Sequence, residues 1–480
     1  MLGKIASLTS ALDRAAISYC HWKSNESIDA SLRGVNDLDL LVAREDALRF
    51  RSVLADFGFV QVRPTPDREI LGIEDFIGLD DESGKMIHVQ PHYELILGDD
   101  MTKSYRIPIE REYLASATVG TAGIPLPEPA FEYLVFVVRM VLKHCPAEAL
   151  VARKGRLTQS ERRELADLEQ RLGPSGADEL RHSLLPFLDD ETFDLGRRAI
   201  ERDAGLLLRA TAGRRMVRCL VGQSRHRPAI DSILKVRARW RASRRRMIGP
   251  RRRKHPTSGG LIVAVVGGDG SGKSSLVDGL VGSLDSTIDV MRAHLGKPPR
   301  SRLTRVITRP LRILRNRGAF SQTRLPAWHV HEDFPGIVYA LWHTLIARDR
   351  FLLYARMRRA AERGIVVISD RFPLDRITNM DGRRLGALPG VADRPLARWL
   401  RDREDLYYRR ILPPDVILVL RVPPAVAVGR RDDQDGEFVR LRAAEIWDAD
   451  WDLSGAHVLD ASRTQAEVFS DARAIVWAHL

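Results

Sequence analysis

The sequence predicts an α/β protein of several domains: a mixed α/β domain, a helical connector, and a C-terminal parallel sheet flanked by helices. Three observations support this prediction. Short helix-like and strand-like patterns alternate up to residue 124, strand-like patterns disappear over 125–234, and apolar runs alternate with helical stretches from residue 261. A chain of 480 residues also exceeds what one hydrophobic core usually holds, so we expect more than one domain.

The composition is that of a globular protein, with 44% hydrophobic and 29% charged residues. The three cysteines lie far apart without a CxxC pair, which is typical of a chain in a reducing compartment. The chain does not begin with a basic segment followed by a long apolar stretch, so we expect no signal peptide and a cytoplasmic location.

Residues 1–124 are expected to form the mixed α/β domain. Apolar residues recur at helical spacing over 2–16 and 43–58. An apolar run covers 17–22, and strands are expected over 37–42, 59–63, 76–80 and 85–92. Residues 125–234 are expected to form the helical domain, with helices over 129–144 and 158–172. The apolar stretch 130–142 is too short to cross a bilayer and contains Glu132 and Arg139, so it predicts a buried helix.

Residues 235–260 are expected to be a basic linker. No acidic residue occurs between Lys235 and Lys254, and the net charge of +13 is concentrated there. The basic residues are Lys235, Arg237, Arg239, Arg241, Arg244, Arg245, Arg246, Arg251, Arg252, Arg253 and Lys254. A solvated linker is the main interpretation, and contact with an anionic membrane surface is the main alternative. Nucleic acid is a weaker one, because Trp240 is the only aromatic residue in the run and no nucleic-acid-binding motif accompanies it.

Residues 261–480 are expected to form the parallel-sheet domain. Apolar runs over 261–266, 288–293, 364–369, 416–422 and 457–459 predict its strands. Thr464 and Glu467 form a capping-box pattern that opens the last helix.

A phosphate-binding loop follows the first of these strands. The G-x-x-x-x-G-K-[ST] pattern is formed by Gly267, Gly268, Asp269, Gly270, Ser271, Gly272, Lys273 and Ser274, and Ser275 comes next. The glycines let backbone N–H groups turn toward phosphate, Lys273 reaches the β and γ phosphates, and Ser274 ligates magnesium. We therefore expect ATP and Mg²⁺ to bind here.

The loop resembles that of the thymidylate kinase family, which commonly reads Gly-x-Asp-Gly-x-Gly-Lys-Ser and thus includes Asp269. The resemblance implies that Asp269 contacts the sugar of the acceptor. A second matching segment is the strand that ends in Asp370 and Arg371. By resemblance, Asp370 lies near magnesium or the acceptor phosphate, and Arg371 holds that phosphate. If no phosphate-binding loop preceded it, an Asp-Arg pair at the end of a strand would be equally consistent with a surface ion pair.

A third segment, 414–431, is similar to the later strand and mobile lid of that family. The resemblance implies that Arg430 and Arg431 close over the transferring phosphate, where they would stabilise its charge. A solvated basic turn is the alternative. The segments by which that family recognises thymidylate are not evident here, so thymidylate itself is not implied as the acceptor. The resemblance implies an acceptor that is a nucleoside monophosphate or a related small molecule. The run Arg348, Asp349 and Arg350 resembles a family element at the acceptor, with a solvated helix face as the alternative.

The N-terminal domain has a second candidate site. Asp37 and Asp39 alternate on one strand, so both point to one face and are candidate ligands of a divalent metal. With Gly34 before them, they resemble the active-site strand of the nucleotidyltransferase fold. In proteins of that fold, a third carboxylate commonly lies on a neighbouring strand. Here the strand over 85–93 instead presents His88, Gln90 and His92 on one face, so it stays open whether this domain is catalytic.

The leading expectation is an ATP- and magnesium-dependent kinase of a small acceptor, fused to a nucleotidyltransferase-like domain. The alternative is a regulatory protein that binds ATP and carries a catalytically inactive nucleotidyltransferase-like domain.

Overall fold

The computed structural model describes the chain apart from residues 67, 100–101, 121–122, 147–155, 173–175, 249–252, 317–333, 335, 378–380, 431–435 and 452–454. The chain divides into two compact units, Met1–Lys254 and His255–Leu480. The boundary thus falls inside the segment expected as a linker. No helix among the described residues is long and apolar enough to cross a membrane.

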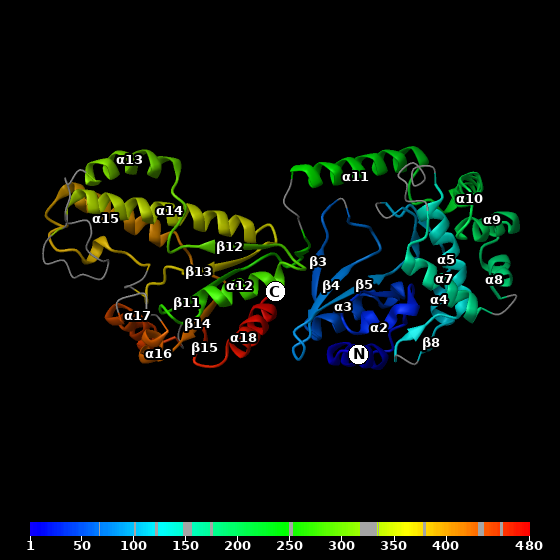
Figure 1. The fold of residues 1–480 in the computed structure, drawn as a ribbon, viewed down its shortest axis with the longest axis horizontal. Helices are drawn as coiled ribbons and strands as arrows, with labels where there is room; N and C mark the ends of the chain where they lie inside the picture. Colours follow the sequence, from blue (N-terminus) through cyan, green and yellow to red (C-terminus); the bar gives the residue numbers. More distant parts are fainter. Residues whose placement is uncertain are drawn as a thin grey trace. The chain divides into compact units, whose positions relative to one another are not determined.

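The first unit contains a mixed sheet. Its strands are β1 (Tyr19–His21), β2 (Leu38–Val42), β3 (Val60–Arg63), β4 (Asp75–Leu79) and β5 (Met86–His92). They lie in the order β1-β2-β5-β4-β3, and only β2 and β5 run parallel. Helices α1 (Gly3–Arg14), α2 (Ile28–Leu32) and α3 (Ala47–Asp56) accompany this sheet (Figure 1). The parallel pairing places Asp39 of β2 opposite Gln90 of β5, which brings the start of β2 beside the strand that carries His88 and His92.

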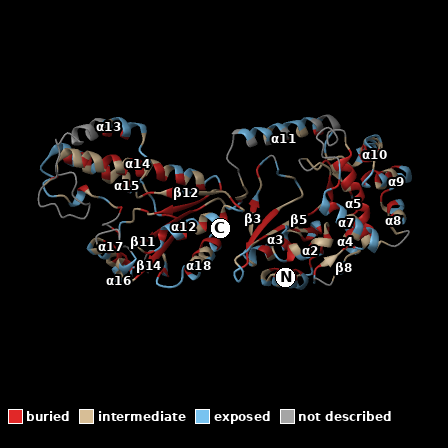
Figure 2. Cartoon of the chain, in the orientation of Figure 1, coloured by how far each residue is buried: buried red, intermediate tan, exposed pale blue. Residues whose placement is uncertain are grey.

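Helix α5 (Pro129–His144) lies at the centre of the helical part of the first unit and is buried along nearly its whole length (Figure 2). The helices that pack against it are α7 (Gln159–Arg171), α8 (Gly176–Leu184), α9 (Asp190–Ile200) and α10 (Leu206–Cys219). This part of the chain also contains α4 (Glu110–Ala115) and α11 (Pro228–Ile248). Glu132, Arg139 and Lys143 share one side of α5, and the other sides are apolar and packed against neighbouring helices. The sequence predicted a buried helix here, and the structure confirms it. Two-residue strands pair as β6 (Ile96–Leu97) with β7 (Tyr105–Arg106), and β8 (Thr118–Val119) with β9 (Pro125–Leu126).

The basic segment 235–260 differs from the expected linker. Up to Ile248 it is the second half of helix α11. Arginine and alanine dominate this stretch and both favour helix, so its charge does not prevent helix formation.

The second unit has an all-parallel five-stranded sheet in the order β12-β13-β11-β14-β15. Its strands are β11 (Ile262–Gly267), β12 (Val290–His294), β13 (Val366–Asp370), β14 (Val416–Arg421) and β15 (His457–Asp460). Every residue of β11 and β13 is buried, as expected for a parallel sheet covered on both faces.

Helices cover both faces of this sheet (Figure 1). They are α12 (Lys273–Leu284), α13 (Arg302–Asn316), α14 (Ile337–Ala361), α15 (Pro395–Arg409), α16 (Pro424–Gly429), α17 (Gly436–Asp448) and α18 (Gln465–Ala478). Helix α12 packs with α18, and α14 packs with α15. The central strand β11 lies between β13 and β14, so its C-terminal end lies at the point of the sheet where α/β proteins bind ligands.

Candidate functional site

The phosphate-binding loop connects β11 to α12, and its glycines are required by close packing. A Cβ atom on Gly268 would lie 2.9 Å from Ala443 Cα in α17, and one on Gly270 would lie 2.6 Å from the Ala427 oxygen in α16. Gly270 also has a φ of +79°, in the left-handed region that favours glycine. The loop can therefore approach these helices only without side chains at these positions.

Lys273 is buried at the first position of α12, and its Nζ donates a 2.5 Å hydrogen bond to the Gly268 carbonyl oxygen. Burial lowers the pKa of Lys273 to about 8, and the positive charge of Arg371 acts in the same direction while Asp269 opposes it. Ser274 and Ser275 are exposed on the same turn of α12. The lysine is thus held in place by the loop.

Asp269 joins the loop to two arginines. Its Oδ1 lies 3.1 Å from Arg371 Nη2, and its Oδ2 lies 2.7 Å from Arg442 Nη1. Although burial opposes the shift, the hydrogen bond from Arg442 and the nearby charges of Lys273 and Arg371 lower the pKa of Asp269. The carboxylate predicted to meet the acceptor sugar therefore also positions both arginines. Arg442 was not predicted, because it lies far along the chain in α17 and no local pattern marks it.

Asp370 is the last residue of β13, and its two carboxylate oxygens have different surroundings. Its Oδ2 lies 3.4 Å from His294 Nδ1, whereas its Oδ1 is buried without a hydrogen-bond partner among the described residues. Burial opposes ionisation, but the His294 contact and the charge of Lys273 lower the pKa of Asp370. An ionised oxygen without a partner fits the hard-cation chemistry of Mg²⁺. The Asp370 position is therefore compatible with the predicted magnesium role.

Arg371 follows with a φ of +65°, an uncommon backbone conformation for a residue with a side chain. A Cβ atom on Gly296 would lie 2.6 Å from Arg371 Cδ, so the arginine packs directly over that glycine. The backbone turn directs the guanidinium toward Asp269 instead of along the strand. Backbone strain of this kind is often found at functional sites.

A cavity of about 660 Å³ opens beside the loop. The loop residues Gly270, Ser271 and Gly272 form one wall, and Arg430 lies on another, where its Nη1 donates to the Ala461 oxygen at 3.0 Å. The rest of the lining includes Ser275, Leu276, Gly279, Arg463 and Phe469. The cavity thus adjoins the phosphate loop and has room for a nucleoside. Arg431, the other predicted lid residue, lies outside the described residues.

The segment predicted to meet the acceptor has a different arrangement. Asp349 and Arg350 are buried, so the alternative of a solvated helix face does not hold for them. Arg350 donates to the Leu295 and Gly296 oxygens at 2.7 and 3.2 Å, and its Nη2 lies 2.9 Å from Asp381 Oδ1. Because the guanidinium is already satisfied by protein atoms, Arg350 fixes the loop after β12 that carries Gly296.

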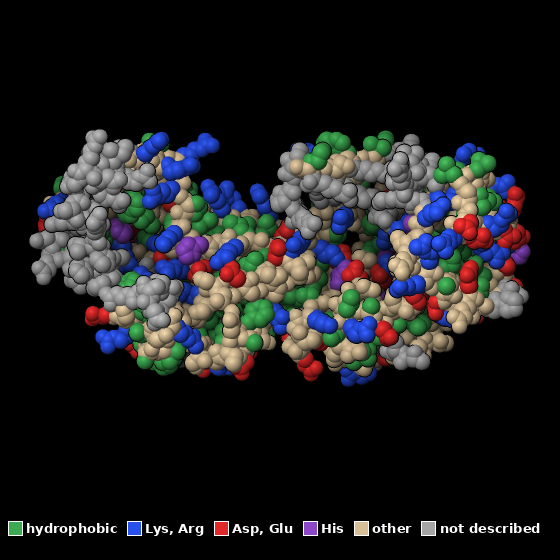
Figure 3. All heavy atoms as spheres, viewed as in Figure 1, with side chains coloured by type: hydrophobic (Ala, Val, Ile, Leu, Met, Phe, Trp, Pro, Cys, Tyr) green, Lys and Arg blue, Asp and Glu red, His purple; other side chains and the backbone are tan. Residues whose placement is uncertain are grey.

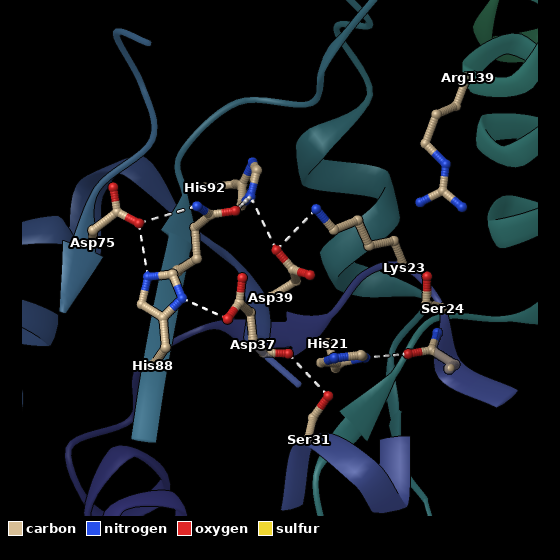
Figure 4. A network of polar contacts seen from close by, with 12 residues as sticks. His21, Lys23, Ser24, Ser31, Asp37, Asp39, Asp75, His88, His92 and Arg139 are labelled. Carbon is tan, nitrogen blue, oxygen red and sulfur yellow. Dashed lines mark hydrogen bonds and ion pairs between the residues drawn. The ribbon is translucent and has the colours of Figure 1, made fainter. Parts of the chain in front are cut away.

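The first unit brings Asp37 and Asp39 to a second cavity, of about 640 Å³. Asp39 Oδ1 lies 2.8 Å from Lys23 Nζ and 3.5 Å from His92 Nε2, and Asp37 Oδ1 lies 2.6 Å from His88 Nδ1 (Figure 4). Burial opposes the shift, yet Lys23 and His92 hold the pKa of Asp39 far below its usual range. Asp39 is therefore ionised in this cavity.

Asp75 is a third carboxylate near this pair, and the sequence analysis did not single it out. Its Oδ1 lies 2.7 Å from His88 Nε2 and 2.8 Å from Lys254 Nζ, so His88 bridges Asp37 and Asp75 (Figure 4). Although burial opposes it, these two carboxylates raise the pKa of His88. The strand predicted over 76–80 began one residue too late to include Asp75.

The wall of this cavity contains buried polar atoms without partners. Among the described residues, these include His21 Nε2, Trp22 Nε1 and Arg139 Nε. Buried polar groups are normally hydrogen-bonded, so a cluster of exceptions around one cavity indicates a place for a polar ligand or water. All three residues line the cavity that Asp37 and Asp39 also line.

Within the described ranges, no group of three or more His, Cys, Asp or Glu side chains is arranged to hold a metal ion by itself. Magnesium in phosphate-binding sites usually takes several of its ligands from water and phosphate, so one or two protein ligands suffice. Ser274, Asp370, Asp37 and Asp39 therefore remain predicted ligands.

Comparison with known proteins gives similarity over part of the chain. No protein-family model matches it. The chain is 31% identical over 229 residues to a thymidylate kinase of Xanthomonas euvesicatoria pv. vesicatoria, which covers 46% of this chain and 85% of that enzyme. It is 29% identical over 183 residues to the uncharacterized ATP-binding protein YghR of Escherichia coli, covering 36% of this chain and 70% of that protein. YghS of the same organism, with the same description, is 28% identical over 179 residues.

Proposed function

Because the chain belongs to the thymidylate kinase family over its matched part, we propose that the second unit is an ATP- and magnesium-dependent phosphotransferase. Its acceptor is a nucleoside monophosphate or a related small molecule. The observation that carries this proposal is the convergence of Lys273, Asp370 and Arg371 at the C-terminal edge of one parallel sheet.

Each side chain has a separate role in this proposal. Lys273 and the loop N–H groups hold the β and γ phosphates of ATP, and Arg371 orients the phosphate of the acceptor. Ser274 and Asp370 would hold magnesium, which neutralises phosphate charge when bound. An acceptor oxygen forms a bond to the γ phosphorus while the bond to the leaving ADP oxygen breaks. Arg430 lines the cavity beside the loop, where it would face the nucleotide, and Arg442 would hold the Asp269 carboxylate in place.

The decisive experiment is incubation of the protein with ATP, Mg²⁺ and a panel of nucleoside monophosphates, with detection of ADP and of the phosphorylated product. Acceptor-dependent ADP that disappears in Lys273→Ala supports the kinase. ATP binding without acceptor-dependent turnover would support the second candidate, an ATP-binding regulatory protein. The relatives described as ATP-binding proteins are compatible with either function.

We further propose that the first unit is nucleotidyltransferase-like. The specific observation in its favour is the cavity that Asp37 and Asp39 share with the unpartnered polar atoms of His21, Trp22 and Arg139. In this proposal the two carboxylates hold Mg²⁺ and the neighbouring cations face phosphate. Calorimetric titration of the protein with nucleoside triphosphates and Mg²⁺ tests it, because Asp37→Ala with Asp39→Ala should remove only magnesium-dependent binding at this cavity.

A further inference from the structure

Helix α11 exposes a stripe of large apolar side chains. Ile233, Val236, Trp240 and Met247 are 66%, 67%, 62% and 78% exposed, respectively. Their spacing of three, four and seven residues places them on one face of the helix. Figure 3 shows hydrophobic side chains along the outer side of α11. A single exposed leucine or valine is ordinary, but an aligned set on one helix indicates a contact surface.

The opposite face of α11 is fastened to the first unit. Asp231 and Ala238 are buried, seven residues apart on that face. The Ser104 hydroxyl donates to Asp231 Oδ1, and Lys235 Nζ, one turn further along the same helix, lies 2.8 Å from Asp231 Oδ2. The backbone N–H of Arg225, just before the helix, donates to the Ser104 oxygen at 2.8 Å. The contacts of Ser104 hold the first turn of α11 against the first unit, and the exposed apolar stripe lies on the opposite face of the helix from Asp231 and Ala238.

The charged side chains beside the apolar stripe are positive. Asp231 is the only acidic residue of α11, and none follows it up to Lys254. Arg237 and Arg244 are exposed next to the apolar side chains, and the Arg244 guanidinium lies 5.5 Å from the centre of the Trp240 ring. A helix with an apolar face, a tryptophan and flanking arginines matches the chemistry of an anionic phospholipid surface.

We propose that α11 binds in the plane of an anionic bilayer, with Ile233, Val236, Trp240 and Met247 at the boundary between headgroups and acyl chains. Arg237 and Arg244 contact the lipid phosphates. Binding of nucleic acid would use arginines and stacking aromatic rings, and the aliphatic side chains of this stripe would not contribute to it. The apolar stripe therefore favours lipid over nucleic acid.

The test is co-sedimentation of the full chain with vesicles of phosphatidylglycerol and phosphatidylcholine, compared with phosphatidylcholine alone. We expect binding to the anionic vesicles and its loss in Val236→Ser/Trp240→Ser. Arg237→Gln/Arg244→Gln should weaken binding by about tenfold or more, because each arginine near the surface contributes about 1 kcal/mol. All four positions are exposed, so these variants retain the fold, which circular dichroism and ATP binding check.

Trp399 provides a matched control. It is 52% exposed on α15, with Arg403 stacked 5.3 Å from its ring centre, in the same i,i+4 arrangement as Trp240 and Arg244. Asp402 and Asp405 lie beside it in the sequence, so Trp399→Ser should leave vesicle binding unchanged. The proposal is overturned if anionic vesicles are not bound at low salt, or if Val236→Ser/Trp240→Ser binds them normally. It is also overturned if a DNA or RNA duplex, and not the vesicles, is bound in a manner that depends on Arg237 and Arg244.

Discussion

Lys273 lies buried beside the Gly268 carbonyl, where its ammonium group has lost most of its contact with water. Burial therefore lowers its pKa to about 8, so a large fraction of the lysine is neutral in slightly alkaline solution. The phosphates of ATP would stabilise the protonated form and raise this pKa again. Nucleotide binding and proton uptake are thus coupled at one side chain.

We predict that ATP binding in slightly alkaline solution is accompanied by net proton uptake through Lys273. Calorimetry in buffers of different ionisation enthalpy measures this uptake. Lys273→Arg is the control, because arginine stays charged and should take up none. Equal uptake by the variant would assign the proton to another group. In the absence of ATP, the pKa of Lys273 is lower in the folded protein than in the unfolded chain, so the unfolded chain binds more protons between these two values. The contribution of Lys273 to the free energy of unfolding therefore increases from about pH 8 to about pH 10.

A second residue-scale prediction concerns Arg371, which faces Asp269 from the end of β13. Arg371→Lys keeps the charge but removes the planar fork, so acceptor use should fall by about tenfold or more. ATP affinity should change little. Calorimetric ATP binding and acceptor-dependent turnover separate the two effects. Weakened ATP binding with normal acceptor kinetics would contradict this placement of Arg371.

At the scale of elements, the loop depends on how closely α16 and α17 approach it. Gly268→Ala would place a methyl group 2.9 Å from the Ala443 backbone, and a helix backbone cannot yield as a flexible side chain would. We predict a loss of about 1–3 kcal/mol in stability. The measurement is the thermal transition of the second unit, recognised as the one that ATP shifts upward.

Gly282 provides the matched control within α12. A Cβ atom there meets nothing within 4 Å, and its φ is not in the left-handed region. Gly282→Ala should therefore stabilise the same unit by about 0.5–1 kcal/mol, because alanine favours helix. If both alanine variants had the same stability as the wild type, the close approach of α17 to the loop would be wrong.

The sequence predicted elements well where the signal was local. The loop is one contiguous motif, and the five strands of the second unit appear as separate apolar runs. Prediction from the sequence failed for contacts that depend on tertiary packing and for a helix whose composition is dominated by charge. Arg442 contacts Asp269 only because α17 packs over the loop. The second half of α11 was predicted as a linker because its composition is strongly basic. The paired strands β6 to β9 are too short to show periodicity.

At the scale of the whole molecule, each unit contains its own core and its own candidate site. We therefore predict that Asp37→Ala with Asp39→Ala removes any magnesium-dependent nucleotidyl transfer but leaves ATP turnover by the second unit largely intact. Parallel assays of both activities on the same folded preparation test this independence. Loss of both activities would show that the two sites are coupled.

The order of strands in the second unit has a consequence for synthesis of the chain. Strand β11 comes first but lies at the centre, where Ile262 pairs with Val367 and Val263 pairs with Val416. Both partners leave the ribosome long after β11, so its two edges stay unpaired while the intervening helices are made. The nucleotide loop is thus among the first parts of this unit to be translated and among the last to acquire its shape. A nascent chain that ends before β14 should therefore not yet hold ATP.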